Sequence, residues 1–254
     1  MPRITVATLN LRNRRNRWPE RRQLVVNELV EAQPDLLSIQ EIFRPIGQGR
    51  WLRNQVNSRI SGSSKEPYRL IQKRKQHLIQ GYYEGIGIMS RIGVLSHDAI
   101  SLGYGGRVAL RVTVELPGGE PLEFVAVHLH HIAEEREARE EQVQRLVGWL
   151  GDRNPSPLQV VAGDFNEIPD GPAMKLMRQS YRSTFVEYRG YDPIATFPTA
   201  LLPDVNWSGC LDYIFISSAI AKVVEVSLFC KKPDATDPTL YPSDHVGLLA
   251  TLEI

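Results

Sequence analysis

The chain is poor in cysteine, with Cys210 and Cys230 as its only two, and it has no long apolar run. Two cysteines this far apart exclude a disulfide-rich scaffold and a CxxC metal site, and they favour free, buried thiols. No apolar stretch approaches the roughly 18 residues that cross a bilayer. The first residues, MPRITVATLN, enter an alternating strand pattern without the apolar core of a signal peptide. We therefore expect a cytoplasmic protein without a transmembrane segment.

The sequence also lacks internal repeats, low-complexity tracts and Gly/Ser linkers, so nothing marks a domain boundary. Of its 254 residues, 42% are hydrophobic and 23% are charged, which is ordinary for a globular protein. We expect one domain over residues 1–254, and a monomer.

The net charge of +1 hides an uneven distribution along the chain. Residues 1–80 contain 16 Lys and Arg against 6 Asp and Glu, whereas the remainder contains 14 against 23. This asymmetry indicates either an anionic partner on one side of the molecule or a fold that interleaves the two halves.

Strand-like segments occur along the whole chain and helical ones are fewer. Runs typical of strands are residues 4–10, 36–41, 85–90, 108–116, 122–129, 158–165, 211–217, 223–229 and 246–254. Helical spacing or start signals occur in residues 19–32, 50–60, 134–150 and 172–179. This pattern predicts two packed β-sheets with helices outside. Residues 42–77 and 187–209 are expected to form long loops of the kind that often carry function.

Polar side chains follow several of these strands at the point where each one ends. The segment VVAGDFNEIPDGP (160–172) is typical, because Asp164 and Asn166 flank Phe165 directly after an apolar run. Each such residue alone is consistent with a turn, a solvated strand end or a hydrogen-bonded core histidine. The full set is Asn10, Glu41, His128, His131, Asp164, Asn166, Asp212, Asp244 and His245. Together they offer hard oxygen ligands and imidazoles, which suit a divalent metal and proton transfer.

The ordered series TLN, IQE, VHL, GDFN, LDYIF and SDH, from Thr8 to His245, resembles the endonuclease/exonuclease/phosphatase superfamily with its DNase I-like fold. The resemblance implies an α/β fold: a four-layer α-β-β-α sandwich of two mixed sheets with outer helices. It also implies hydrolysis of a phosphoester that depends on Mg²⁺, with Mn²⁺ as the alternative.

The same resemblance implies a catalytic role for five residues. Asp164 is similar to the residue that orients or deprotonates the attacking water, and Asn166 to the amide that holds the phosphate. His245 resembles the histidine that contacts the phosphoryl oxygen, Asp212 its orienting partner, and His128 a histidine that assists the leaving group. If the strand continues past Asp164, Asp164 and Asn166 point the same way, with Phe165 opposite.

The metal and the phosphate are assigned in the same way. Glu41 resembles the metal-ligating carboxylate, Asn10 lies beside it, and Asp244 resembles an auxiliary metal ligand or an orienting carboxylate. Arg107 resembles a family arginine near the phosphate, and the residues around it, GGRVAL, match the family less closely than the other motifs do. One departure is the arrangement Asn10-Leu11-Arg12, where some DNA-repair members carry N-x-D. A second strong metal ligand is therefore not expected at this place, nor is repair of abasic DNA.

The substrate is indicated only by basic and aromatic residues. The segment 11–22 contains six arginines, and residues 44–80 contain nine Lys and Arg against one acid, Glu66. They are interleaved with the aromatic residues Trp51, Tyr68, Tyr82 and Tyr83. This pattern favours a nucleic-acid groove, although solvated loops would give it too. The alternatives are a phospholipid or small-molecule phosphodiesterase or phosphatase facing an anionic lipid, and a catalytically inert phosphate-binding scaffold.

Overall fold

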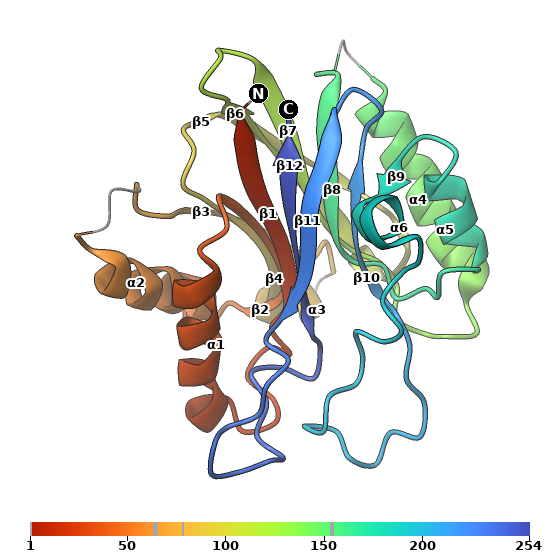
Figure 1. Cartoon of the computed structure of the whole chain (residues 1–254). Coiled ribbons are helices and arrows are strands. Elements are labelled where there is room, and N and C mark those ends of the chain that lie inside the picture. Colours follow the sequence, from red (N-terminus) through yellow and green to blue (C-terminus); the bar gives the residue numbers. More distant parts are fainter. Residues whose placement is uncertain (1, 63–65, 78, 153–154) are drawn as a thin grey trace.

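Two mixed β-sheets pack face to face with helices on both outer sides, as the computed structural model shows (Figure 1). The structure describes residues 2–62, 66–77, 79–152 and 155–254. The expected four-layer α-β-β-α arrangement is thereby confirmed. No helix within these described residues is long and apolar enough to cross a membrane.

The first sheet has the strand order β11-β12-β1-β2-β4-β3. Its strands are β1 (Arg3–Asn10), β2 (Leu36–Phe43), β3 (Arg69–Arg74), β4 (Glu84–Ser90), β11 (Lys222–Phe229) and β12 (Gly247–Glu253). β1 and β2 run parallel, whereas the other neighbours run antiparallel.

The second sheet has the order β5-β6-β7-β8-β10-β9. Its strands are β5 (Val94–Ser101), β6 (Val108–Glu115), β7 (Pro121–His128), β8 (Leu158–Asp164), β9 (Arg182–Ser183) and β10 (Asp212–Ile216). Again one central pair, β7 and β8, is parallel. Each sheet therefore carries one parallel pair at its centre, and the carboxyl ends of the two strands in a pair lie at the same edge.

The outer layers are formed by helices on each sheet. Helices α1 (Trp18–Ala32) and α2 (Gln48–Ile60) cover the first sheet, while α4 (Arg136–Leu150) and α5 (Pro172–Met177) cover the second (Figure 1). The short helices α3 (Gln80–Tyr83) and α6 (Thr184–Arg189) and the 3₁₀ turn η1 (Tyr104–Gly106) lie in connections. The start of α1 follows the sequence signal, because Pro19 fits the first helical turn, where its missing N–H has no partner to lose.

Burial falls into three layers, as the amphipathic pattern requires. One apolar cluster lies between the sheets, a second lies under α1 and α2, and a third lies under α4 and α5. The layer between the sheets also contains a polar tie, since the buried Ser38 Oγ donates to the carbonyl oxygen of Ala162 over 2.8 Å. This bond joins β2 to β8 near the edge where the polar strand ends gather.

All nine strands expected from the sequence are present, with ends that differ by up to two residues. The sequence missed β3, β5 and β9. β3 (RLIQKR) and β5 (VLSHDAIS) are partly exposed outer strands rich in polar residues, so their hydrophobic alternation is weak. β9 has only two residues. The expected long loop 42–77 contains α2 and β3, and 187–209 begins inside α6.

Candidate active site

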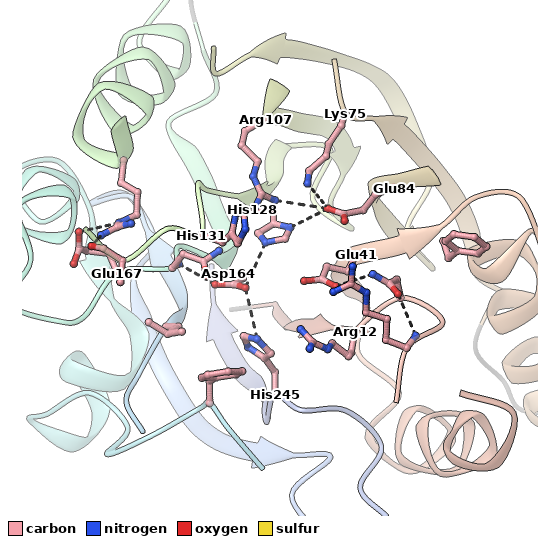
Figure 2. Close-up of a pocket in the computed structure, with 18 of the residues that line it drawn as sticks. Arg12, Glu41, Lys75, Glu84, Arg107, His128, His131, Asp164, Glu167 and His245 are labelled. Atoms are coloured by element: carbon pink, nitrogen blue, oxygen red, sulfur yellow. Dashed lines mark hydrogen bonds and ion pairs between the residues drawn. The ribbon is translucent and has the colours of Figure 1, made fainter. Parts of the chain in front are cut away.

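Five predicted site residues come together because the two parallel strand pairs end at the same edge of the sandwich. Asn10 and His128 are the last residues of β1 and β7, and Asp164 ends β8. In the second sheet, His128 and Asp212 both pair with Asp164 in register, one on each side. Glu41 lies near the end of β2. A cavity of about 930 Å³ at this edge is lined by Glu41, His128 and Asp164, among others (Figure 2).

Asp164 lies at the centre of the site and is 1% exposed. Its Oδ2 accepts a 2.9 Å hydrogen bond from the side-chain amide of Asn10, and its Oδ1 accepts one of 2.9 Å from the backbone N–H of Asn166. Burial raises the pKa of Asp164 above its usual range, although the facing His245 opposes this shift. A carboxylate with a raised pKa and fixed orientation is suited to accept a proton near neutral pH.

His245 is held in one orientation by Asp212. Its Nδ1 lies 2.8 Å from Asp212 Oδ2, and its Nε2 faces Asp164 Oδ2 at 3.8 Å. Burial lowers the pKa of His245, but Asp212 and Asp164 outweigh it and raise the pKa to about 10. Ligand atoms of these three residues lie within 4.8 Å of one another, a spacing that can hold a metal. Asp212 and His245 also form a buried hydrogen-bonded pair that holds the imidazole beside Asp164.

Glu41 has the surroundings expected of a carboxylate that binds a cation. The register of β2 against β4 shifts between Ile39 and Ile42, and Glu41 adopts a φ of 53° in this irregularity. A left-handed non-glycine residue costs energy, and such strain is found where a side chain has to be re-aimed. Burial raises the pKa of Glu41, and so do the nearby Glu84 and Asp244.

The partners of Glu41 are amides. Asn13 Nδ2 lies 3.1 Å from Glu41 Oε2 and Asn10 Nδ2 lies 3.5 Å from Oε1, and within the described ranges Glu41 forms no ion pair. The carboxyl oxygens of Glu41, Glu84 and Asp244 lie close enough to raise the pKa of Glu41, and such a group of oxygens fits a hard divalent cation. The donor set therefore fits the magnesium expected from the sequence.

Asp244 is fully buried and pairs with Arg12, whose Nε lies 3.1 Å from Asp244 Oδ2. Arg12 is the residue at the N-L-R departure noted in the sequence. Its guanidinium thus brings a positive charge beside Glu41 where an acidic residue would have brought another ligand. Of the two roles left open for Asp244, this contact favours an orienting carboxylate.

The opposite wall of the cavity carries a second group of charged residues. Lys75 Nζ lies 2.6 Å from Glu84 Oε1, with Arg107 Nη1 at 3.7 Å and His128 Nδ1 at 3.9 Å from the same oxygen (Figure 2). His128 also faces Asp164, with 3.6 Å between Nε2 and Oδ2. Burial and the neighbouring cations Arg107 and Lys75 hold the pKa of His128 well below its usual value. His128 is therefore a neutral imidazole at physiological pH.

The loop that carries Arg12 and Asn13 is organised by a buried arginine of α1. Arg21 is 0% exposed, and its guanidinium donates to six backbone carbonyl oxygens. These belong to Leu11, Arg12, Asn13, Arg15, Asn16 and Pro242. The bonds tie the loop to the segment before Asp244, so one side chain fixes both sides of the contact between Arg12 and Asp244.

The comparisons with known proteins identify the family. The model of the Endonuclease/Exonuclease/phosphatase family matches residues 7–245. The chain belongs to this family. Members of the family hydrolyse phosphoester bonds and generally use a divalent metal, and the resemblance seen in the motifs is confirmed. A search of curated protein sequences found no match.

Solved structures of low sequence identity share the fold. The endonuclease/exonuclease/phosphatase from Bacteroides vulgatus has 19% identity and a TM-score of 0.76, with 100% of both chains covered. The human nocturnin catalytic domain has 19% identity and a TM-score of 0.78, covering 99% of this chain and 93% of that one. A humanised D. rerio TDP2 has 17% identity and a TM-score of 0.78, covering 99% of both.

Two expectations about this family member need correction. β8 ends at Asp164 and Asn166 has a φ of 50°, so strand alternation does not aim Asn166 into the cavity. A turn does so instead. The backbone N–H of Asn166 donates to Asp164 Oδ1, and the side-chain Nδ2 of Asn166 donates to the carbonyl oxygen of Leu129 over 3.1 Å. Phe165 packs in the apolar cluster under α4 and α5. The turn and the site, which were alternatives in the sequence, are the same structure.

The second correction concerns the aromatic residues of the basic segment. Tyr68 is 3% exposed with its hydroxyl donating to the carbonyl of Pro34, and Trp51 is half-buried and packs edge-on against Trp18. Neither of them is among the residues that line the cavity. Tyr83 does line the cavity. Of the arginines in 11–22, the cavity is lined by Arg12, Arg14 and Arg15. Lys65, counted among the basic residues, lies outside the described residues.

Sequence reasoning missed several charged residues of the site. Lys75, Glu84, Arg139 and Glu167 all line the cavity and were not singled out. The signal for Glu167 was visible, since it follows Asn166 directly in GDFNE. Lys75 follows β3 and Glu84 begins β4, and the sequence did not place these strand ends next to β7.

Proposed function

We propose that this protein is a divalent-metal-dependent phosphodiesterase that acts on nucleic acid. The proposal rests on one observation above the others. The buried Asp164 is fixed by Asn10 and by the backbone of Asn166, and it faces a histidine whose charge is maintained by Asp212. A base and a cationic donor on either side of one position are what hydrolysis of an anionic ester requires.

Glu41 would hold the metal, with Asn10 beside it, and Asp244 would keep Arg12 close to the same place. When bound, a divalent cation neutralises charge on the phosphate oxygens and stabilises the leaving oxygen. Arg12, held by Asp244, would add positive charge for the phosphate at the same place.

The chain's own residues perform the proton transfers. Asp164 takes a proton from the attacking water, since its raised pKa makes it a base at neutral pH without leaving it protonated permanently. His245 uses Nδ1 to bind Asp212, which leaves its protonated Nε2 to donate to a phosphoryl oxygen. Asn166 has a second amide hydrogen beyond the one bound to Leu129, which can hold the phosphate. His128, being neutral, orients the leaving group through a hydrogen bond.

Arginines and exposed aromatic rings around the cavity support nucleic acid as the substrate. Arg14 and Arg15 line the cavity together with Tyr83 and Trp207, whose side chains are 48% and 47% exposed. Tyr83 stacks on Phe43 at 6.1 Å between ring centroids. Exposed rings next to arginines are able to stack bases while the arginines bind phosphates. The solved structure of the human nocturnin catalytic domain contains a bound sulfate, so a protein with this fold accepts a tetrahedral anion.

The test is cleavage of plasmid DNA and of labelled single-stranded DNA and RNA in Mg²⁺, in Mn²⁺ and in EDTA. Asp164→Asn should lower the rate by about 10²–10⁴-fold and keep its circular dichroism spectrum. Asp152→Asn is the matched control, since Asp152 is an exposed aspartate outside the cavity.

Three outcomes would redirect the proposal. Turnover of Asp164→Asn near that of the control would overturn the mechanism. Hydrolysis of phosphoinositide vesicles or small phosphodiesters, but not of nucleic acid, would move the substrate to the phospholipid or small-molecule class. Phosphate binding without any hydrolysis would leave the inert scaffold.

A further inference from the structure

The cavity has two electrostatically different halves. One half is lined by the carboxylates of Glu41 and Asp164, next to the cations Arg12 and His245, and suits a metal. The other half contains Lys75 and Arg107, which are only 7% and 3% exposed although both are cations (Figure 2). Burial of two like charges is costly unless something compensates it.

The compensation available on the protein is incomplete. Glu84 is the carboxylate that both cations contact, at 2.6 Å for Lys75 and 3.7 Å for Arg107. The neighbouring imidazoles of His128 and His131 are neutral, because burial and Arg107 lower the pKa of both. Arg107 Nη1 is buried and has no hydrogen-bond partner among the described residues. Glu41 acts on both cations and Asp164 on Arg107, but neither carboxylate forms an ion pair with Lys75 or Arg107 among the described residues. This half of the cavity therefore has a local excess of positive charge and an unused donor.

The position of the two cations is built into the backbone. The N–H of Gln76, next to Lys75, donates to the carbonyl of Gly106, next to Arg107, over 2.8 Å. Gly106 has a φ of 65°, and a side chain at this position would come within 2.8 Å of the backbone of Gln76. Only glycine permits this close approach without strain. The ends of β3 and η1 are thus locked together, which places Lys75 and Arg107 against one Glu84.

We infer that Lys75 and Arg107 form a subsite for a second phosphate group of the substrate, distinct from the phosphate that is hydrolysed. The inference rests on the proposed function. His128 lies between the two positions, because its Nε2 faces Asp164 and its Nδ1 faces Glu84. A substrate phosphate bound by the two cations is therefore one imidazole away from the reacting one. The group is either a terminal phosphomonoester or the next phosphodiester along a strand.

The first experiment measures binding without catalysis. Inorganic phosphate is titrated calorimetrically in EDTA into the wild type, Lys75→Met and Lys73→Met. Lys73→Met is the matched control, because it removes the same charge two residues earlier, in β3, at a residue that does not line the cavity. Loss of a charge-assisted contact should weaken binding about tenfold in Lys75→Met. Lys73→Met should bind as the wild type does.

Equal binding by Lys75→Met and the wild type, or equal weakening in Lys75→Met and Lys73→Met, would overturn the subsite. Lys75→Arg keeps the charge and should retain binding, which separates the lost contact from misfolding. Neither result bears on the phosphodiesterase proposal, because that is tested by Asp164-dependent hydrolysis and not by binding in EDTA.

The second experiment distinguishes the source of the phosphate. If the subsite takes a monoester, the wild type should bind a dithymidylate that carries a 5′- or 3′-terminal phosphate better than a dithymidylate without a terminal phosphate. The KM for the phosphorylated substrate should then be about tenfold lower. A trithymidylate without terminal phosphates should show the lower KM if it takes the neighbouring phosphodiester. Lys75→Met should remove whichever difference is found. Equal KM values for all these substrates would contradict the inference.

Discussion

The imidazole Nδ1 of His245 lies 2.8 Å from Oδ2 of Asp212, and both side chains are buried. This pairing decides the protonation state of His245, because burial alone would lower its pKa. With Asp212 and Asp164 close by, the imidazole remains protonated across neutral pH, and its free Nε2 is the donor that faces Asp164.

Asp212→Asn should lower the pKa of His245 from about 10, because burial remains while the largest attractive charge and its hydrogen bond are lost. NMR titration of the imidazole resonances measures this directly. The raised pKa also stabilises the folded state below pH 6.5, and this contribution is lost as pH rises towards 10. The free energy of unfolding of the wild type should therefore fall between pH 6.5 and pH 10, and it should fall less in Asp212→Asn. A wild-type His245 that titrates near 6.5 would contradict the assignment.

Glu41→Gln should separate metal binding from fold stability. Mg²⁺ should raise the melting temperature of the wild type, because a ligand that binds only the folded state stabilises it, and Glu41→Gln should lose this effect. In EDTA at pH 7 the variant should melt higher than the wild type. The pKa of Glu41 is raised in the folded state, so its contribution favours folding at low pH and is lost as pH rises through that pKa.

Glu225→Gln is the control for this measurement, because Glu225 is an exposed glutamate on β11. Its response to Mg²⁺ should match that of the wild type. Calorimetric scans with and without EDTA measure both effects. A magnesium response in Glu41→Gln equal to that of the control would show that Glu41 is not the principal ligand.

Arg21→Met should loosen the loop that carries Arg12 and Asn13. Six carbonyl oxygens lose their donor, and carbonyls that stay buried without a partner are costly, so we expect a destabilisation on the order of 3 kcal/mol. Urea unfolding measures this loss. Arg22→Met is the neighbouring control, in which a contact with the ring of Trp51 is removed. Similar free energies of unfolding for the two variants would contradict the role of Arg21.

The polar ends of the central strands could be predicted because they follow clear apolar runs. Asn10, His128 and Asp164 each come directly after such a run, and parallel pairing brings strand ends to one edge. The family motifs then connected Asp212 and His245 to the same place, although these two come from β10 and a loop.

The parts that could not be predicted depend on packing between distant segments. Arg21 occupies an ordinary position on an amphipathic helix, and its burial arises only because the preceding loop wraps around it. Lys75 follows a polar outer strand, where a lysine is normally solvated. Nothing in its local sequence shows that Glu84 and Arg107 enclose it.

Arg139 and Glu167 should act as positioning residues for the loops on both sides of the cavity. The two side chains are each 2% exposed, and Arg139 Nε lies 3.0 Å from Glu167 Oε2. Arg139 also donates to the carbonyls of Ile132 and Ala133 in the loop after His131. The pair thus links that loop to the residue after Asn166, so its loss should move both phosphate-facing segments.

Glu167→Gln should therefore lower kcat about tenfold and leave KM nearly unchanged, because the reacting groups are misplaced while the arginines that bind the substrate remain. Glu187→Gln is the control, since it breaks the exposed pair with Arg182. In the double variant Arg139→Met with Glu167→Leu, apolar packing should restore the free energy of unfolding, whereas kcat should remain low. If kcat returns together with stability in the double variant, the pair contributes only to the fold.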